Sequence, residues 1–250
     1  MREHQGVYMQ IGKLIGVGNT AKVYEWEEDK VLKLFHEGYS DEAINKEYNN
    51  AMAIREKEFL KPKAYDIISY DGRKGIVYDK VIGESLQDEV LRTGDISTCA
   101  HHMAQLHKEI MNNKIKDVPN YKGFLRYHLP NTLPDNKRNE LLLMIDNLAD
   151  GDTLCHGDFH PGNILMSEGC IYVIDFMNVC RGSYLYDIAR TVFLVEYTPV
   201  PQELPNRDMI IKFKKALVDQ YLVLMDVSRD MIKDFLEVII AVRKGECPNE

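Results

Sequence analysis

The sequence has few of the features that mark secreted, membrane-spanning or nucleic-acid-binding proteins. Its 250 residues include five cysteines, an odd number with no CxxC pair, which suits a reducing compartment better than a disulfide framework. No apolar run reaches about 18 residues and residues 1–4 lead into no signal-peptide core, so we expect a cytoplasmic protein without a membrane partner. No strongly basic block occurs, which argues against a nucleic-acid partner.

Acidic residues outnumber basic residues by 39 to 31, for a formal net charge of −8. Residues 151–200 hold six acids and two bases, whereas residues 201–250 hold nine acids and eight bases. This distribution permits a cationic substrate but does not require one. Apolar residues make up 45% of the chain, which is ample for a buried core, and at this length we expect no further domain.

The most informative segment is CHGDFHPGNIL at residues 155–165, followed by VIDF at residues 173–176. Asp158 and Asn163 have four residues between them, as in the HRDxxxxN catalytic loop of protein kinases, and Asp175 ends the later apolar run. The Mg²⁺ that accompanies ATP takes carboxylate and amide oxygens, so Asn163 and Asp175 are the predicted metal ligands. Asp158 is the predicted catalytic base, which accepts or orients the proton of the attacking hydroxyl.

Two histidines flank Asp158 at a spacing that would suit zinc on a helix. His156 and His160 stand four apart, but Pro161 and Gly162 disfavour a regular helix there. We therefore expect His156 to pack and form hydrogen bonds within the loop. Asp, Gly and Asn are also common in ordinary turns, so the kinase interpretation depends on the joint pattern and not on a single tripeptide.

A candidate phosphate-binding loop, LIGVGNTAKVY, lies near the N-terminus, with Ala21 where the kinase glycine-rich loop has its third glycine. Gly16 and Gly18 would let the backbone approach phosphates closely, although a GxG between two strands is also common in hairpin turns. The next run, residues 30–35, alternates like a strand and contains Lys33. We expect Lys33 to hold the α and β phosphates of ATP.

A helix is expected from Asp41 to about Glu58, with Ser40 as its N-cap and acids in its first turn. Glu47 lies on the face that this helix turns inward, so it is the candidate partner of Lys33. The alternative is a partly exposed acid on an ordinary amphipathic helix. The inward stripe comprises Ile44, Tyr48 and Ala51.

Together these motifs resemble the aminoglycoside phosphotransferase and choline kinase superfamily, whose members share a protein-kinase-like fold. The most specific part of the resemblance is LCHGDFHPGNIL followed by VIDFMNVCRGSYLYDIAR. It implies ATP and Mg²⁺ as cofactors, Asp158 as base, and Asn163 and Asp175 as metal ligands. It also implies that Asp187 braces the catalytic loop through hydrogen bonds, although an ordinary acid at a helix start is the alternative.

The expected fold is α+β and two-lobed, as in protein kinases, with an N-terminal antiparallel sheet, one helix beside it, and a mainly helical C-terminal lobe. Residues 1–82 would form the nucleotide-binding lobe, with strands from about Val7. Residues 83–250 would form the catalytic and substrate-binding lobe. The resemblance places a hinge near residues 79–83, whose backbone would meet adenine.

Helical spacing of apolar residues recurs in the second lobe, at residues 100–110 and 141–148. His107 lies on the first of these stripes and is expected to be a core histidine with satisfied hydrogen bonds. The helices from about Asp208 to Arg243 are expected to form the wall of the substrate site.

The chain between Asp175 and Asp187 argues against a protein substrate. Only eleven residues lie where protein kinases have an activation loop and an APE segment, no APE occurs, and Met177 replaces the DFG glycine. We therefore expect a small-molecule kinase that phosphorylates a substrate hydroxyl, with an antibiotic-modifying aminoglycoside phosphotransferase as the first candidate. A kinase of choline, homoserine, a sugar or a macrolide and a non-catalytic nucleotide-binding regulator stay open, and the sequence does not predict the oligomeric state.

Overall fold

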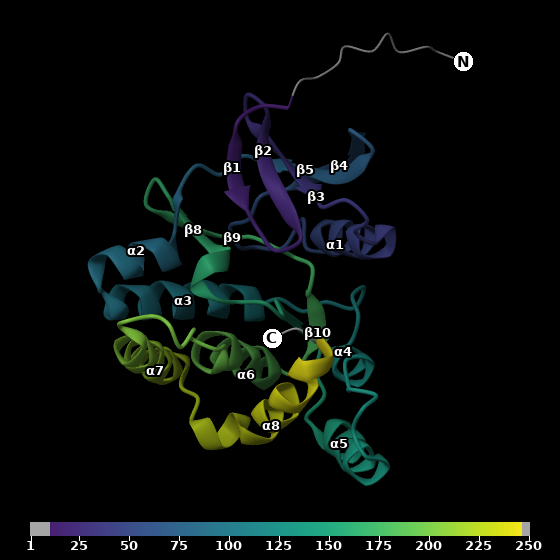
Figure 1. Cartoon of the computed structure of the whole chain (residues 1–250), viewed down its shortest axis with the longest axis vertical. Helices are drawn as coiled ribbons and strands as arrows, with labels where there is room; N and C mark the ends of the chain where they lie inside the picture. Colours follow the sequence, from purple (N-terminus) through teal and green to yellow (C-terminus); the bar gives the residue numbers. More distant parts are fainter. Residues whose placement is uncertain (1–10, 247–250) are drawn as a thin grey trace. The chain divides into compact units, whose positions relative to one another are not determined.

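The computed structural model describes residues 11–246, which form two compact units (Figure 1). The first unit holds the described residues up to Glu56 together with Lys61–Ile82. The second unit holds Lys57–Leu60 and the chain from Gly83 onward. The predicted strand that starts near Val7 lies outside the described residues.

The first unit is a five-stranded antiparallel sheet with one helix, as the sequence predicted. The strand order is β1-β2-β3-β5-β4, and α1 packs against β4 and β5. The β2–β3 and β4–β5 hairpins are closed by two-residue turns that contain charged residues or glycine. In the β4–β5 turn, Asp71 and Gly72 have φ of 49° and 73°. The elements are β1 (Leu14–Val17), β2 (Ala21–Glu27), β3 (Lys30–Phe35), α1 (Asp41–Ala53), β4 (Ala64–Tyr70) and β5 (Arg73–Asp79).

Helix α1 begins as expected but ends five residues earlier than the predicted Glu58. At its start, the Ser40 hydroxyl oxygen accepts a hydrogen bond from the backbone N–H of Ala43 at 3.4 Å. At its end, Ile54 is buried, and the next N–H, that of Arg55, bonds three residues back to Met52 instead of four. The helix stops because Ile54 is anchored in the core and the chain then leaves for the second unit at Lys57.

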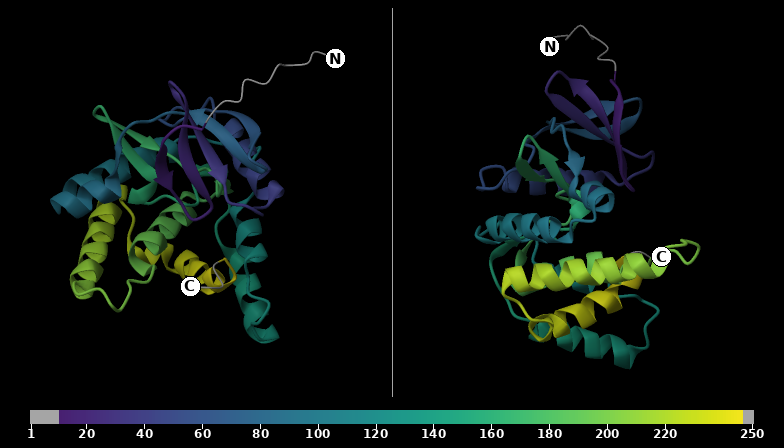
Figure 2. Two further views of the ribbon diagram at one scale, coloured as in Figure 1. Left: turned by 45° about the horizontal axis from the view of Figure 1, so that its top comes forward. Right: turned by 90° about the vertical axis from the view of Figure 1, so that its left-hand side faces the viewer.

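The second unit is mainly helical and contains two small antiparallel sheets (Figure 2). Helix α3 packs against α7, and α6 packs against α8. The helices are α2 (Leu86–Thr93), α3 (Ile96–Met111), α4 (Tyr121–Tyr127), α5 (Asp135–Asn147), α6 (Tyr184–Val192), α7 (Arg207–Met225) and α8 (Arg229–Glu246), with the short turns η1 (Pro161–Asn163) and η2 (Phe193–Tyr197). The sheets are β6 (Glu84–Ser85) with β8 (Ile164–Ser167) and β9 (Cys170–Val173), and β7 (Thr153–Cys155) with β10 (Cys180–Gly182).

Apolar stripes at helical spacing bury α3 and α5 as the sequence predicted. The buried set on α3 includes Ala100, Met103, His107 and Ile110. Within residues 11–246, no helix combines the length and the apolar character that a bilayer span requires. The expected α+β fold is therefore confirmed, and two short sheets in the second unit position the loop that carries the kinase-like motif.

Candidate active site

The motif CHGDFHPGNIL runs from the end of β7 through a loop and η1 into β8, the strand labelled in Figure 1. Gly157 lies in this loop with φ of +75°, a conformation that side chains other than glycine rarely adopt. A Cβ atom at this position would also collide with the backbone oxygen of Asn178. The loop therefore needs glycine immediately before Asp158, both for its backbone angle and for its packing.

Asp158 and Asn163 contact each other directly. The Asn163 side chain donates through Nδ2 to the Asp158 backbone oxygen at 2.9 Å and to Asp158 Oδ2 at 3.1 Å. Because the amide nitrogen faces Asp158, the amide oxygen, which is the atom that can bind Mg²⁺, lies on the other side of the Asn163 head group. The Asp158 carboxylate, which could act as a base, therefore lies on one side of the Asn163 head group, and the Asn163 amide oxygen, which could bind a metal, lies on the other.

The pairing of β8 with β9 brings Asn163 close to Asp175. Ile164 is opposite Val173 in this ladder, and the backbone N–H of Ile174 donates to the Asn163 carbonyl at 3.0 Å. Asp175 itself has φ of +69°, which is strained for a residue with a side chain and is a feature that clusters at functional sites. The two predicted metal ligands therefore come from the adjoining ends of neighbouring strands.

Asn163 and Asp175 offer oxygen ligands from only two side chains. This suits Mg²⁺ better than a metal ion whose coordination positions are all filled by protein side chains. Mg²⁺ usually keeps several waters and is held by one or two protein oxygens together with substrate phosphates. In the described part of the chain, no group of three or more His, Cys, Asp and Glu side chains is placed to hold a metal ion. Water molecules or substrate phosphates would therefore have to complete the coordination of a metal held by Asn163 and Asp175.

Asp187, near the start of α6, holds the beginning of the catalytic loop. Its carboxylate is fully buried and accepts hydrogen bonds from the backbone N–H of His156 at 2.7 Å and of Gly157 at 2.8 Å. It also lies 2.9 Å from Nε2 of His107, whose Nδ1 lies 2.6 Å from the hydroxyl of Tyr221. If Nε2 carries the proton and donates to Asp187, Nδ1 accepts from Tyr221. His107 is thus the bonded core histidine that the sequence predicted.

The pKa of Asp187 reflects two opposing effects. Burial alone would raise it, but the hydrogen bonds from His107 and from the Gly157 N–H outweigh burial and hold the pKa below its ordinary value. Asp187 is therefore ionised at neutral pH, which makes its bonds to the loop charge-assisted.

His156 connects the catalytic loop to the segment that carries Asp175. Its Nε2 lies 3.2 Å from the carbonyl oxygen of Ile174, and its Nδ1 accepts from the Asp158 N–H at 3.3 Å. Burial lowers the pKa of His156, so the ring is neutral at neutral pH. His160 has a different partner, because its Nδ1 accepts from the Gly162 N–H at 3.1 Å.

Arg190 is a site residue that sequence reasoning missed. It lies on α6, is only 1% exposed, and donates from Nε to the Gly157 carbonyl at 3.1 Å. Its other donors bind the Glu246 carboxylate. A signal was available, because Arg190 stands three residues after Asp187 in a helix whose remaining positions are mostly apolar or aromatic.

The first unit contains the predicted Lys33–Glu47 ion pair, with Nζ 2.7 Å from Oε1. Lys33 lies on β3 and Glu47 on α1, and their side chains are 14% and 1% exposed. The hydroxyl of Tyr78, on β5, also donates to Glu47 Oε1 at 3.0 Å. Glu47 is therefore not the partly exposed acid of the alternative interpretation.

Gly16 and Gly18 lie in and just after β1, in the hairpin that leads to β2. Neither has a positive φ, and an added Cβ would meet its nearest neighbour at 3.4 Å and 3.5 Å, which are ordinary contacts. Among the described residues of the first unit, nothing requires glycine at these two positions. Glycine here is compatible with both the hairpin interpretation and the close approach of a phosphate.

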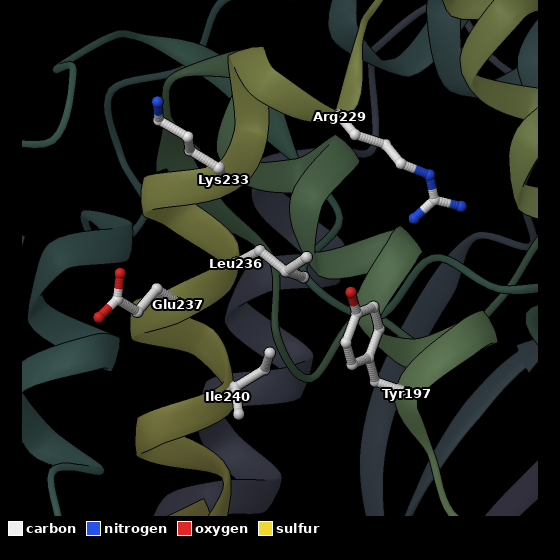
Figure 3. Close-up of a pocket in the computed structure, with 6 residues that line it drawn as sticks. All are labelled: Tyr197, Arg229, Lys233, Leu236, Glu237 and Ile240. Carbon is white, nitrogen blue, oxygen red and sulfur yellow. The ribbon is translucent and has the colours of Figure 1, made fainter.

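A pocket of about 410 Å³ lies along α8, within the predicted substrate wall from Asp208 to Arg243, and its lining includes none of the other predicted site residues (Figure 3). Arg229 at its edge forms ion pairs with Glu196 and Asp219, each at 2.7 Å, so its charge is already compensated. The lining residues are Tyr197, Arg229, Lys233, Leu236, Glu237 and Ile240. This pocket adds no group to the arrangement around Asp158.

Several solved structures have folds similar to this chain at low sequence identity. The amicoumacin kinase hAmiN, in complex with AMP-PNP, Ca²⁺ and Ami, has 17% identity and a TM-score of 0.62, over 95% of this chain and 80% of that chain. The GDP and kanamycin complex of APH(2")-IIia has 16% identity and a TM-score of 0.60, over 96% and 86%. APH(3'')-Id from Streptomyces rimosus, with ADP and streptomycin, has 15% identity and a TM-score of 0.57, over 88% and 90%. At these identities the similarity establishes the fold.

Family membership comes from the sequence. No curated protein gave a significant match. The model of the phosphotransferase enzyme family, APH, matches residues 12–209, which is well over half of the chain and spans all the predicted site residues from Gly16 to Asp187. The chain therefore belongs to the phosphotransferase enzyme family, and it is a small-molecule phosphotransferase with an alcohol group as acceptor.

Proposed function

We propose that the protein transfers the γ-phosphoryl group of ATP, in the presence of Mg²⁺, to a hydroxyl group of an aminoglycoside. The observation that carries this proposal is the arrangement of Asp158, Asn163 and Asp175. Asn163 bonds to Asp158 through its amide nitrogen, and the β8–β9 ladder sets it beside the backbone of Ile174, next to Asp175. One short segment of the fold thus offers a base and two metal-binding oxygens.

In this proposal Asp158 orients the acceptor hydroxyl and takes its proton as the new O–P bond forms, while the bond from the γ-phosphorus to the β,γ-bridging oxygen breaks and ADP leaves. Asn163 and Asp175 would hold Mg²⁺. The bound metal would offset the negative charge of the phosphates during transfer. Asp187 holds the loop through two buried hydrogen bonds and His156 through a partly buried one, so Asp158 would need little reorganisation when substrate binds.

Residues 1–82 would bind the nucleotide. Residues 83–250 would supply the catalytic base and the helices that contact the substrate. Lys33 would bind the α and β phosphates, and Glu47 would orient it through their 2.7 Å ion pair. Gly16 and Gly18 would let the backbone approach the phosphates, and the backbone near residues 79–83 would meet adenine. The helices from Asp208 to Arg243 would form the substrate wall.

The aminoglycoside as acceptor is supported by the ligands of two similar structures, which hold kanamycin and streptomycin. The amicoumacin kinase keeps a second acceptor class open, namely another small hydroxylated molecule. A non-catalytic regulator is less well supported, because Lys33, Glu47, Asp158, Asn163 and Asp175 are all retained.

The test is ADP release from ATP and Mg²⁺ with a panel of aminoglycosides, together with mass spectrometry of each acceptor. Asp158→Asn should bind ATP like the wild type and lose turnover, whereas Asp117→Asn, at an exposed acid outside the loop, should keep it. Phosphorylated aminoglycoside that depends on Asp158 supports the proposal. Nucleotide binding without any phosphorylated aminoglycoside rejects that acceptor class, and the same assay then moves to choline, homoserine, sugars and macrolides.

A further inference from the structure

We propose that Arg190, held in place by Glu246, is a positioning residue for Asp158. Through Gly157 this buried ion pair ties the loop that carries the base to the last turn of α8. The inference rests on the proposed function, because it takes Asp158 as the catalytic base. It gives a role to Arg190, the last residue of VIDFMNVCRGSYLYDIAR, and to Glu246, which lies outside that motif.

Two side chains of helix α6 bind the backbone of Gly157, one at its N–H and the other at its carbonyl. Asp187 and Arg190 are three residues apart, so their side chains project from the same face of the helix. Asp187 Oδ1 accepts from the Gly157 N–H at 2.8 Å, and Arg190 Nε donates to the Gly157 carbonyl at 3.1 Å. The first bond orients the peptide before Gly157, and the second orients the peptide that joins Gly157 to Asp158.

The Gly157–Asp158 peptide is the backbone unit that determines where the Asp158 side chain starts. Arg190 therefore acts one peptide away from Asp158. It binds the carbonyl of Gly157, whose φ lies in the left-handed region. A glycine with φ of +75° has more freedom than other residues, so its conformation depends on what holds it. Two bonds from one rigid helix supply that constraint.

Arg190 can hold this carbonyl only if its own position is determined. Its guanidinium is buried at 1% exposure, and Glu246 binds it in a two-point fork, with Nη1 2.8 Å from Oε2 and Nη2 bonded to Oε1. Such a planar fork sets the orientation of the whole head group, including Nε. The rings of Phe124 and Phe193, with centroids 5.4 Å and 5.9 Å from Cζ, flank the guanidinium.

Glu246 supplies the charge that makes a buried arginine acceptable. Burial would raise its pKa, but the bonds from Arg190 and Arg243 hold the pKa below its ordinary value, so the carboxylate is ionised at neutral pH. Without that charge, Arg190 would be a buried cation with no carboxylate against it, and it would reorient. The loop would then lose its bond at the Gly157 carbonyl.

The test compares Glu246→Gln and Arg190→Lys with the matched control Glu196→Gln. Glu196 pairs with Arg229 at the opposite end of α8, at 2.7 Å and 19% side-chain exposure, so this ion pair is not made with the loop. Each variant is measured for kcat, for the KM of ATP, for thermal stability, and for amide hydrogen exchange of the peptide that covers residues 156–163. Lysine keeps the positive charge but cannot form the fork and reach Gly157 together.

We expect Glu246→Gln and Arg190→Lys to lower kcat by about tenfold or more with little change in the KM of ATP, since small misplacements of a reacting group cost rates of this order. Exchange in residues 156–163 should rise in both variants and stay at the wild-type level in Glu196→Gln. If Arg190→Lys does not fold, Glu246→Gln carries the test, because Glu246 lies at a helix end with 12% of its side chain exposed.

Wild-type kcat and wild-type loop exchange in Glu246→Gln would overturn the inference. So would an equal fall of kcat in Glu196→Gln at equal loss of stability, which would make the Arg190 pair a general structural contact. A wild-type protein that phosphorylates no acceptor defeats the proposed function instead. Loop exchange then decides alone whether Glu246 and Arg190 hold the loop.

Discussion

Asp187 Oδ1 accepts a hydrogen bond of 2.8 Å from the backbone nitrogen of Gly157, 30 residues earlier in the chain, and the bond is buried. The other carboxylate oxygen accepts from the His156 N–H and lies 2.9 Å from His107 Nε2. One ionised side chain thus satisfies two backbone groups of a loop that has no ladder partner there. The loop that carries Asp158 is held mainly by side chains of α6, and this can be tested directly.

Asp187→Asn should lower the free energy of unfolding by about 3–5 kcal/mol, because the amide loses the charge that three donors face and turns an N–H group toward one of them. Turnover should fall in the same variant. Denaturant unfolding and steady-state kinetics measure the two effects. Asp135→Asn, at an exposed first-turn acid of α5, should cost less than about 1 kcal/mol. If both substitutions lower the free energy of unfolding by the same amount, Asp187 is an ordinary acid at the start of a helix.

Glu47→Gln should weaken ATP binding by about tenfold or more, since hydrogen bonds to charged groups contribute about 1.5–3 kcal/mol. The substitution keeps the shape of the side chain but removes the charge that lies 2.7 Å from Lys33 Nζ. Titration calorimetry with a non-hydrolysable ATP analogue measures the affinity. Glu42→Gln, on an exposed face of the same helix, is the control and should bind normally. Unchanged affinity in Glu47→Gln would remove this residue from the nucleotide site.

His156→Asn should reduce the loss of stability between pH 7.5 and pH 5.5. Burial lowers the pKa of His156 in the folded protein, while the unfolded chain takes up a proton below its ordinary pKa of about 6.5. The unfolded state then binds more protons, so stability is present above about pH 6.5 and is lost as pH falls toward the folded pKa. Urea unfolding at both pH values gives the difference. His101→Asn, at an exposed position of α3, should keep the wild-type dependence, and an unchanged dependence in His156→Asn would contradict the prediction.

Gly157→Ala should destabilise the protein by about 1–3 kcal/mol more than Gly169→Ala, because overpacking adds to the backbone cost. Both glycines have left-handed backbones, with φ of +75° and +79°. A Cβ at Gly169 has nothing within 4 Å, whereas one at Gly157 meets the backbone of Asn178. Denaturant unfolding measures both variants. Equal losses would mean that the loop moves away from Asn178 without cost.

Short sequence patterns predicted the structural features that depend only on neighbouring residues. The start of α1 follows from Ser40 and the acids after it, and β3 follows from the alternation around Lys33, since caps and strand periods involve only neighbouring residues. The end of α1 at Ala53 was not predictable in this way. It depends on the burial of Ile54 and on the departure of the chain to the second unit.

The sequence by itself determined which groups are the candidates for phosphoryl transfer, because Asp158, Asn163 and Asp175 stand at the spacing of a kinase catalytic loop and the strand end after it. Only the tertiary structure decided how that loop is held. Arg190 on α6 binds the loop, Glu246 on α8 binds Arg190, and His107 on α3 binds Asp187. The Arg190–Glu246 pair alone spans 56 residues of sequence. A buried charge must find its counter-charge wherever the fold brings one, and neither propensity nor spacing carries that information.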